Sequence, residues 1–333
     1  MNKKFKIGLF GFGTVGKGLF EILEQKKSKE IEIKKICIKD ASKLRIVNNL
    51  EIDSKLFTTS AQEIFDDEEI NLVIELIDDK NTAFHLLESS LKSGRPFISA
   101  NKKMIAENLE KVISLQELYN LPVLYEGAVC GSIPVLKTIE DYFSNDTILS
   151  IEGIFNGTSN YILTQLSKGL TYREALDLAI DSGFSELNPY NDVSGLDSRD
   201  KLTILIAHCF GKLLKPYEIE TKGITEITKS VVDKVNLEGK KIKLIAQVFQ
   251  NNLGYIDARV LPIIKDKDSL LQNVDFEYNG IVIESKNLGK QFLFGKGAGA
   301  LPTGHAVYSD ILLLNSGFSY KYEKVNQNIA EYA

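Results

Sequence analysis

The sequence predicts an α/β protein with two domains, the first built on a doubly wound parallel sheet and the second a mixed α/β domain. Short, continuous apolar runs alternate with helical segments in the N-terminal part, as expected for parallel strands that are covered on both faces. A glycine-rich loop lies between the first apolar run and the first helix. From residue 135 the pattern changes, and strand-like segments follow one another in the C-terminal part.

The first element is a strand, a loop and a helix near the N-terminus. The apolar run FKIGLF leads into GFGTVGKG and then into a helical LFEILEQ. In a G-x-G-x-x-G loop the first glycine permits a tight turn, the second lets the backbone approach a pyrophosphate, and the third allows the helix to pack closely. Gly11, Gly13 and Gly16 therefore predict a Rossmann-type NAD(P) site, against the alternative of a structural glycine turn.

The end of the second strand (31–38) carries the residues that distinguish the two nicotinamide dinucleotides. An acid at this place binds the ribose 2'-hydroxyl of NAD, whereas cations accommodate the 2'-phosphate of NADP. Asp40 is present, but Lys39, Lys43 and Arg45 surround it. The cations favour NADP, with NAD as the alternative cofactor.

A further strand (71–77), a helix and another strand lead to polar residues at the edge of the predicted sheet. Ser99, Asn101 and Lys102 follow the second of these strands. Open α/β sheets bind their ligands at this edge, so Ser99 and Lys102 are expected to contact the cofactor. For Lys102 an ordinary surface lysine is the alternative. One more strand leads to the turn EGAVCGSIP, where the chain leaves the first domain.

The second domain contains a segment that is dense in charge, GFSELNPYNDVSGLDSRDKL. Asp197 and Lys201 lie four residues apart at the start of a predicted helix, which places both side chains on one face. The polar loop before them carries Glu186 and Asp192, and converging carboxylates suit a cationic ligand such as an amino-acid ammonium group. The alternative is a solvated loop followed by an ordinary capped helix.

The remaining segments complete the second domain. Gly211 is placed to end the helix that carries Lys201. Strands are predicted at 241–249, 256–264, 276–285 and 291–294, followed by a glycine-rich turn at 295–304. A helix from residue 305 is expected to pack back against the first domain. The expected domains are residues 1–132, joined by the C-terminal segment 305–333, and residues 133–304.

The composition argues against several classes of protein. A net charge of -5, a pI near 5.5 and the lack of a basic run give no surface for nucleic acid. No apolar stretch of about 18 residues is present to span a membrane. The glycine-rich N-terminus, interrupted by Lys17, does not fit a secretion signal. Three separated cysteines, Cys37, Cys130 and Cys209, predict reduced thiols in a cytoplasmic protein.

Six motifs together resemble the homoserine dehydrogenase family. They occur in that family's order and spacing over nearly the whole chain: GFGTVGKG, SANKK, EGAVCGSIP, GIFNGTSNYIL, GFSELNPYNDVSGLDSRDKL and GKGAGALPTGHAVYSDIL. The resemblance implies an NAD(P)-dependent enzyme that interconverts L-aspartate 4-semialdehyde and L-homoserine, in the biosynthesis of threonine, methionine and isoleucine. It is to the short form of the family, without the motif of a regulatory ACT domain. The resemblance also implies a homodimer.

The resemblance further implies roles for particular residues. Reduction of an aldehyde needs a proton for the developing alkoxide, and a lysine can supply it. Lys201 is the expected general acid and base, Asp197 positions it, and Lys102 assists. The substrate pocket is expected to include Gly183, Glu186, Asp192, Asp197, Gly157 and Thr158. The cofactor is also expected to contact Phe12, Thr14, Val15 and Gly299.

The resemblance implies a structural monovalent cation, sodium or potassium, in the turn that leaves the first domain. Its expected ligands are the side chain of Glu126 and the carbonyls of Val129, Gly131 and Ile133. Oxygen ligands of this kind suit a hard cation. An ordinary tight turn is the alternative.

The chain departs from the family pattern after its third strand, where Asp78 and Asp79 replace a usual pair of glycines. Because this loop borders the cofactor, two acids would weaken or alter the binding of a phosphate-rich ligand. They support one alternative function, a non-catalytic NAD(P)-sensing protein of the same fold. A second alternative, an aspartate-semialdehyde dehydrogenase, needs a cysteine nucleophile with a histidine base, and no such setting is seen around His85, His208 or His305.

Overall fold

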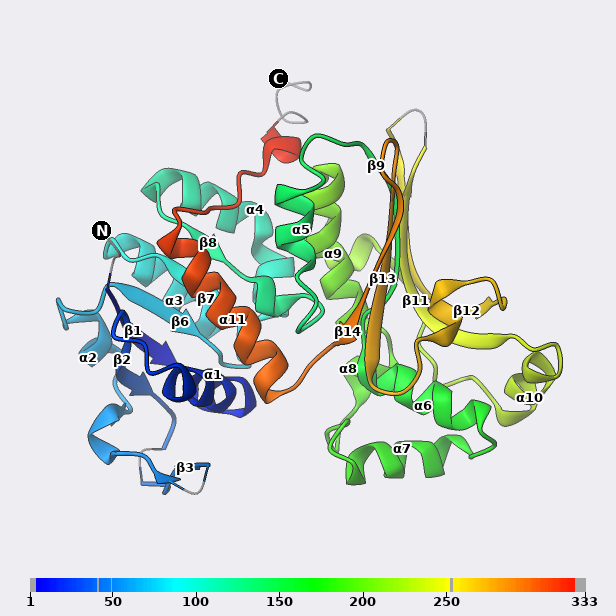
Figure 1. Ribbon diagram of the computed structural model, residues 1–333, viewed down its shortest axis with the longest axis horizontal. Helices are drawn as coiled ribbons and strands as arrows, with labels where there is room; N and C mark the ends of the chain where they lie inside the picture. The colour runs from blue at the N-terminus through cyan, green and yellow to red at the C-terminus, as the bar shows by residue number, and fades with distance from the viewer. Residues whose placement is uncertain (1–3, 41, 49, 252–253, 327–333) are drawn as a thin grey trace. The chain divides into compact units, whose positions relative to one another are not determined.

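Figure 1 shows the computed structural model of the chain, which describes residues 4–40, 42–48, 50–251 and 254–326. The chain forms two compact units. The first contains the described residues up to Ser132 and the returning segment Ala298–Lys321. The second contains Ile133–Gly297 and the described residues from Tyr322 onward.

Six parallel strands form the sheet of the first unit. They are β1 (Phe5–Phe10), β2 (Ile31–Cys37), β5 (Phe57–Thr58), β6 (Leu72–Glu75), β7 (Phe97–Ser99) and β8 (Val123–Leu124). Their order is β5-β2-β1-β6-β7-β8, and each neighbouring pair is parallel. From β1 the chain adds strands on one side and then on the other, which confirms the predicted doubly wound parallel sheet.

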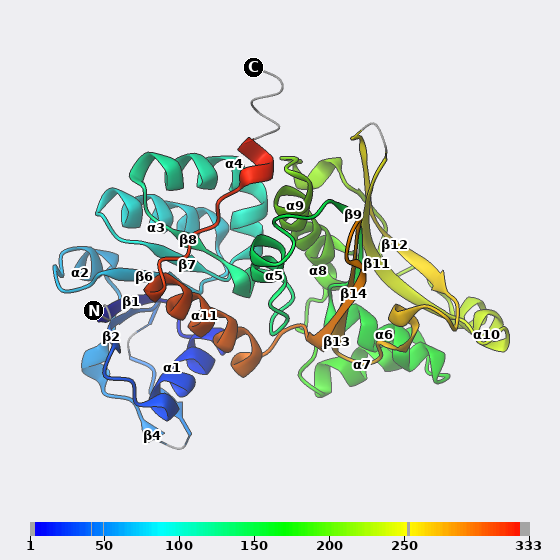
Figure 2. The same cartoon turned by 45° about the horizontal axis from the view of Figure 1, so that its top comes forward.

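The helices of the first unit connect these strands or, in the case of the returning helix α11, pack against the unit. They are α1 (Thr14–Lys26), α2 (Ala61–Phe65), α3 (Lys80–Lys92), α4 (Lys102–Tyr119) and α11 (Ala300–Asn315), with the 3-10 turns η1 (Ser54–Leu56) and η2 (Glu126–Ala128) and a small hairpin of β3 (Ile46–Val47) and β4 (Leu50–Glu51). The returning helix α11 packs along α1 (Figures 1 and 2). The two backbones approach closely at Gly18, where an added Cβ would lie 2.0 Å from the carbonyl oxygen of Ala300. Glycine is therefore required at this crossing.

The predicted glycine-rich turn at 295–304 was wrong in its second half, because α11 already begins at Ala300. Pro302 lies in the first turn of that helix, where a missing backbone N–H costs nothing. Gly304 lies inside the helix, and an added Cβ there would be 2.7 Å from the backbone nitrogen of Leu19. This glycine serves helix packing rather than a turn.

The second unit is built on a mixed sheet. Its strands are β9 (Ile148–Ile154), β10 (Glu220–Thr221), β11 (Lys241–Gln250), β12 (Ile256–Lys265), β13 (Tyr278–Ser285) and β14 (Gly289–Lys296). The order is β10-β12-β11-β9-β13-β14, with β10 and β12 parallel and the other neighbours antiparallel. The strand predicted from residue 276 starts two residues later, because Phe276 has a left-handed backbone with a φ of 59°.

The helices of the second unit are α5 (Val135–Asp141), α6 (Gly157–Ser167), α7 (Tyr172–Asp181), α8 (Tyr190–Val193), α9 (Leu196–Phe210) and α10 (Lys229–Leu237), with the 3-10 turns η3 (Pro216–Glu218) and η4 (Leu270–Asn273). Helix α9 packs against α5, β9, β11 and β12, and every residue from Asp200 to Phe210 is buried. It ends at Gly211, whose left-handed φ of 65° confirms the predicted stop. Its first turn is therefore held on a rigid element.

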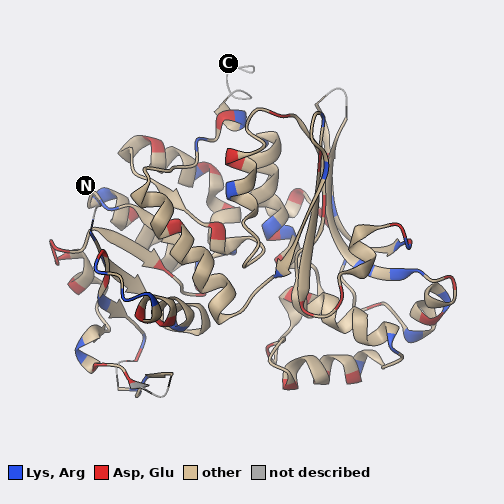
Figure 3. Ribbon diagram, in the orientation of Figure 1, with Lys and Arg blue, Asp and Glu red and all other residues tan. Residues whose placement is uncertain are grey.

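Lys and Arg are interspersed with Asp and Glu along the described backbone of each unit (Figure 3). Among the helices of the described residues, none is both long enough and apolar enough to cross a membrane.

Candidate functional site

Lys201 and Asp197 form a buried ion pair at the first turn of α9. The Lys201 Nζ donates to Asp197 Oδ2, 2.7 Å away, and to the carbonyl oxygen of Phe155, 2.6 Å away. The two charged residues are only 7% and 3% exposed. An ammonium has three N–H donors, and these are its two hydrogen bonds among the described residues, so one donor remains for a ligand. The arrangement suits a group that exchanges a proton with a bound molecule.

Asn156 completes this cluster, and the sequence analysis did not single it out. Its Oδ1 accepts from the backbone of Ser159 and so caps α6. Its Nδ2 donates to Asp197 Oδ2 at 2.9 Å and to Asp192 Oδ1 at 2.6 Å. One neutral amide therefore holds two carboxylates together beside Lys201. No local pattern reveals contacts with residues 36 and 41 positions away.

The start of α6 lies beside this cluster, because Gly157 and Thr158 directly follow Asn156. The Thr158 hydroxyl donates to the carbonyl oxygen of Phe184 at 2.5 Å, which ties α6 to the turn that contains Gly183. Gly183 has a left-handed φ of 75°. Glu186, three residues further, is exposed, and its carboxylate has no hydrogen bond within the described residues. The structure therefore joins Asp192 to the cluster and leaves Glu186 in solvent.

The glycine loop of the first unit has the geometry that a pyrophosphate needs. Gly11 has a φ of 94°, and an added Cβ would lie 2.4 Å from the carbonyl oxygen of Leu76. At Gly13 there is open space where a side chain would be, and at Gly16 an added Cβ would lie 2.6 Å from the carbonyl oxygen of Gly11. Gly13 precedes α1 without a side-chain cap, which leaves the N–H groups of the first turn for an anion.

The neighbours of the glycines shape the loop. Phe12 is buried, with edge-to-face contacts to Phe20 and Phe57, so it holds the loop against the domain. Thr14 and Val15 begin α1 at the more exposed side of the loop. These residues fit a bound dinucleotide through the shape of the backbone.

The cations beyond β2 differ in their availability. The Arg45 guanidinium donates to the carbonyl oxygens of Asp40 and Lys43 and lies 4.9 Å from the centre of the Phe57 ring. These contacts fold the turn on itself and occupy Arg45. Lys39 is exposed. Lys43 is also exposed, so Lys39 and Lys43 are presented to solvent, whereas Arg45 is half-buried.

Glu75 is a buried carboxyl at the carboxyl ends of β6 and β7, and the sequence analysis did not identify it. Its Oε2 accepts from the Ser99 hydroxyl at 2.6 Å, and its Oε1 accepts from the backbone N–H of Ile77 at 2.7 Å. Burial raises the pKa of Glu75 to about 7, against the effect of these hydrogen bonds. The Ser99 hydroxyl is thus engaged inside the sheet edge. The Asn101 amide donates to the Ile77 carbonyl oxygen, which closes the same cluster.

Asp78 and Asp79, which replace the usual pair of glycines, directly precede α3. Asp79 is the N-cap of α3, and its Oδ1 accepts from the backbone of Thr82 at 2.7 Å. Hydrogen bonds from Thr82 hold the pKa of Asp79 below its usual range, and the charge of Lys39 acts in the same direction. Asp79 therefore has a structural role in addition to any effect on the cofactor. Lys102 is the first residue of α4 and is half-buried.

The turn after β8, where the family resemblance implies a monovalent cation, has an unusual backbone and involves two buried carboxyl groups, one of them from α11. Glu126 is 3% exposed, and Cys130 and Gly131 have left-handed φ angles of 56° and 55°. Asp310 of α11 accepts from the backbone of Glu126 through Oδ2, while its Oδ1 is buried without a partner among the described residues. Burial, with the neighbouring charge of Glu126, raises the pKa of Asp310 well above its usual range.

This arrangement fits a bound cation, because the buried Asp310 Oδ1 has no hydrogen-bond partner among the described residues and lies near a second buried acid, Glu126. Val129 and Ile133 are buried on either side of the left-handed residues. The described residues contain no cluster of three or more His, Cys, Asp or Glu side chains that could hold a metal ion. Backbone carbonyls would have to supply most ligands here.

His208 and Cys209 are buried on α9 in structural surroundings. His208 is buried on α9, with Nδ1 2.6 Å from the Glu140 carboxylate and its ring against Tyr322. Burial raises the pKa of the neighbouring Cys209 thiol, which disfavours the thiolate that a nucleophile needs. The other two cysteines are also free thiols.

Two family models match the chain. The model described as homoserine dehydrogenase matches residues 134–312. The model described as homoserine dehydrogenase, NAD binding domain, matches residues 11–126. Together they cover both units.

Individual relatives and solved structures agree with the family models. The homoserine dehydrogenase of Lactococcus lactis is 34% identical over 316 residues, which is 92% of this chain and 73% of that protein. The crystal structure of a homoserine dehydrogenase from Thiobacillus denitrificans matches with a TM-score of 0.87 at 28% identity, over 95% of this chain and 74% of that one. A hyperthermophilic archaeal homoserine dehydrogenase in complex with NADPH matches with a TM-score of 0.80 at 25% identity, over 95% of this chain and 99% of that one.

Proposed function

This chain belongs to the homoserine dehydrogenase family, and on that premise we propose how its residues divide the reaction. It is an NAD(P)-dependent oxidoreductase that acts on a CH–OH group and interconverts L-aspartate 4-semialdehyde and L-homoserine. The observation that carries the proposal is the buried cluster of Lys201, Asp197 and Asn156, since it can pass a proton to and from the reacting oxygen. We place this reaction in threonine, methionine and isoleucine biosynthesis, in the cytoplasm.

Lys201 is the proposed general acid and base. The nicotinamide, when bound, supplies or accepts the hydride. In the reductive direction the remaining N–H of Lys201 donates its proton to the developing alkoxide oxygen; in the oxidative direction the neutral amine takes the hydroxyl proton. Asp197 and the Phe155 carbonyl oxygen occupy the other two donors, which fixes the direction of the third. Lys102 is proposed to assist as a second cation.

The amino group of the substrate is proposed to bind at the acids near α6. Asp192 is held beside Asp197 by Asn156, so negative charge is already gathered there. Gly183 and the exposed Glu186 are proposed to join on substrate binding, together with Gly157 and Thr158 at the start of α6. The tie between Thr158 and Phe184 supports this, because it connects α6 to the turn that carries Gly183.

NADP is the proposed cofactor, with NAD as the alternative. The open space at Gly13 and the uncapped first turn of α1 support a bound pyrophosphate. The exposed cation Lys39 supports a 2'-phosphate, and the archaeal relative was solved with NADPH. Arg45 is proposed to act mainly by shaping the turn. Ser99 and Gly299 are proposed to line the cofactor through their backbones, since the Ser99 hydroxyl is engaged by Glu75.

A sodium or potassium ion is proposed as a structural partner of the turn after β8. Glu126 and the carbonyls of Val129, Gly131 and Ile133 are its proposed ligands. The unpartnered Asp310 Oδ1 supports a positive charge at this place. The ion would lower the free energy of the folded turn by compensating the buried acids.

We also propose a homodimer. Phe249 of β11 and Phe294 of β14 are 43% and 53% exposed. Phe249 pairs with Ser150 of β9, Ser150 with Glu284 of β13, and Glu284 with Lys290 of β14. Paired residues share a face, and Lys290 lies four residues before Phe294, so the two phenylalanine side chains lie on the same face of the second sheet. An apolar sheet face of this kind suits contact with a second copy.

The test of the proposed function is the rate of NADPH and NADH oxidation with L-aspartate 4-semialdehyde, measured beside a Lys39→Ala variant. The wild-type protein is expected to turn over with both and to prefer NADPH, and Lys39→Ala is expected to reduce that preference. A folded protein that binds NADPH but turns over neither cofactor would favour the alternative of a non-catalytic NAD(P)-sensing protein.

A further inference from the structure

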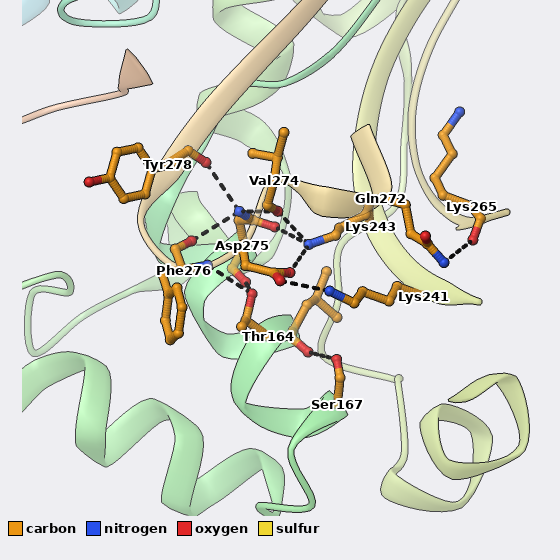
Figure 4. Close-up of polar contacts among 12 residues, drawn as sticks. Thr164, Ser167, Lys241, Lys243, Lys265, Gln272, Val274, Asp275, Phe276 and Tyr278 are labelled. Carbon is orange, nitrogen blue, oxygen red and sulfur yellow. Dashed lines mark hydrogen bonds and ion pairs between the residues drawn. The ribbon is translucent and has the colours of Figure 1, made fainter. Parts of the chain in front are cut away.

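Lys243 of β11 lies 1% exposed inside the second unit, away from the residues already assigned to the reaction. Its Nζ donates to Asn160 Oδ1 at 3.1 Å, to Asp275 Oδ1 at 2.9 Å and to the carbonyl oxygen of Val274 (Figure 4). Three N–H donors thus meet three acceptors, and the buried charge is paired. Burying an ammonium group costs free energy even when it is paired, and the three acceptors show which segments Lys243 holds together.

Asn160 links Lys243 to helix α6. Its Nδ2 lies 2.9–3.1 Å from three carbonyl oxygens, those of Val274, Phe276 and Tyr278. One turn later on α6, Thr164 Oγ1 accepts from the backbone N–H of Phe276 at 3.0 Å. The segment 274–278 is therefore fastened to α6 over its whole length (Figure 4).

The backbone of this segment is strained at Phe276. A bulky residue rarely adopts a φ of 59°, and such a conformation persists only where the surroundings enforce it. The Phe276 ring is held by the Lys168 ammonium, 3.9 Å from its centre. Next along the chain, the Glu277 carbonyl oxygen lies against Gly157, where an added Cβ would be 2.6 Å away. The strained segment thus also contacts the first residue of α6.

A row of polar side chains on one face of α6 connects the hydrogen bonds of Lys243 with the cluster of Lys201, Asp197 and Asn156. Asn156, Asn160 and Thr164 are spaced by four residues and are 5%, 1% and 3% exposed. Asn160 binds Lys243, and Asn156 binds Asp192 and Asp197. Because both amides belong to the same short stretch, a shift or rotation of α6 would move the Asn156 amide away from its two carboxylates.

We propose that Lys243 is a positioning residue for the reaction: through Asn160 it fixes α6, and so keeps the Asn156 amide where it holds Asp197 against Lys201. The inference rests on the proposed function of that cluster. It adds a residue that touches neither substrate nor cofactor and acts through another.

The charge state of Lys243 is consistent with this role. Burial lowers the pKa of Lys243 to about 8, and the Asp275 carboxylate opposes the shift. At neutral pH the amine is therefore mostly charged and keeps its three donors. Lys241 is the other charged group facing Asp275, through Oδ2 at 2.6 Å.

Lys241 provides a matched control. It lies two residues earlier on β11 and pairs with the same carboxylate as Lys243, but its side chain is 29% exposed. In the described part of the chain its side-chain hydrogen bond is to Asp275 and not to α6. Replacing Lys241 removes one of the two cations that pair with Asp275. It leaves the contact between Lys243 and Asn160 intact.

The test compares Lys243→Met with Lys241→Met in homoserine oxidation. Lys243→Met is expected to lower kcat/KM for homoserine by about tenfold to a hundredfold, as for the loss of a buried charged hydrogen bond. It is also expected to shift the pH profile of kcat, since Asp197 no longer holds Lys201 as before. The Kd for NADPH, measured by fluorescence titration, should stay within about twofold, and Lys241→Met should change each quantity by no more than that.

A Lys243→Met protein with the kcat/KM for homoserine and the pH profile of the wild type would overturn the proposal, as would a loss of rate that only follows the folded fraction. If Lys243→Met does not fold, Asn160→Ser decides, because it removes the link and leaves Lys243 bonded to Asp275 and Val274. The same pattern is expected there. An inactive wild-type protein would instead contradict the proposed function itself, so the two failures are distinguishable.

Discussion

Two carboxyl groups, one in each unit, are similarly buried but differ in the charge of their hydrogen-bond donors. Asp197 accepts hydrogen bonds from the Lys201 ammonium and from the Asn156 amide. Glu75 accepts from a hydroxyl and a backbone N–H, those of Ser99 and Ile77. The first carboxylate shares its site with a cation, whereas the second meets only neutral donors. Burial accordingly raises the pKa of Glu75 to about 7.

The difference supports the proposed assignment of Asp197, rather than Glu75, to the chemistry. A carboxylate with a cationic partner holds that cation in a fixed direction, which is the role proposed for Asp197 beside Lys201. A carboxyl group among neutral donors ties backbone segments together, and Glu75 joins the ends of β6 and β7. Changes at Asp197 and its partners should therefore act on the rate, and changes at Glu75 on stability and its pH dependence.

The largest expected effect is that of Lys201→Met. The variant keeps the length of the side chain and removes the proton donor, so kcat for homoserine oxidation should fall by about 10²–10⁴-fold. Binding of NADPH should be retained, because the glycine loop belongs to the first unit. Steady-state kinetics and a fluorescence titration of NADPH check both points. A variant within about tenfold of the wild-type rate would remove Lys201 from this role.

Asn156→Ala should have a smaller effect on the same reaction. Without the amide, Asp192 and Asp197 lose their common donor and repel each other, so Asp197 holds Lys201 less firmly. We expect kcat/KM for homoserine to fall by about tenfold to a hundredfold. The exposed Asn287, which binds Asp146, is a suitable control, and Asn287→Ala should leave the rate unchanged. Equal rates for the two alanine variants would contradict the bridging role.

Glu75→Gln should leave the rate nearly unchanged and alter stability with pH. Between the ordinary pKa of 4.5 and about 7, the folded protein keeps a proton that the unfolded chain has lost. The Glu75 contribution to stability is therefore lost as the pH rises through this window. The wild type should gain up to about 3 kcal/mol in the free energy of unfolding on acidification, relative to Glu75→Gln. Denaturant titrations of both proteins at about pH 5 and about pH 8 measure this difference. Parallel changes in the two proteins would place the pKa of Glu75 near its ordinary value.

Features with a local signature were predicted from the sequence. The parallel sheet, the glycine loop and the pairing of Asp197 with Lys201 each follow from a short period or a fixed spacing. Gly11 and Gly16 have the close approaches, and Gly13 the open space, that this pattern requires. The stop of α9 at Gly211 was likewise visible, because a glycine beyond an apolar helix adopts the left-handed conformation without cost.

Features that depend on distant contacts were not predicted. Asn156 was not among the predicted site residues, because only the folded chain brings it to Asp192 and Asp197. Lys243 is 83 residues from Asn160, so its burial had no signal in the strand pattern. Gly304 was assigned to a turn because its role, contact with the backbone of Leu19, depends on the packing of α11 against α1.

The most direct test of the central claim is chemical rescue of Lys201→Ala. The substitution leaves a space at the buried ammonium position, which a small amine can enter. If Lys201 exchanges the proton, methylamine should restore homoserine oxidation in a saturable way, whereas tetramethylammonium, which has the charge but no exchangeable proton, should not. Equal restoration by both, or none by methylamine in a folded variant that binds NADPH and homoserine, would contradict the role of Lys201 in proton transfer.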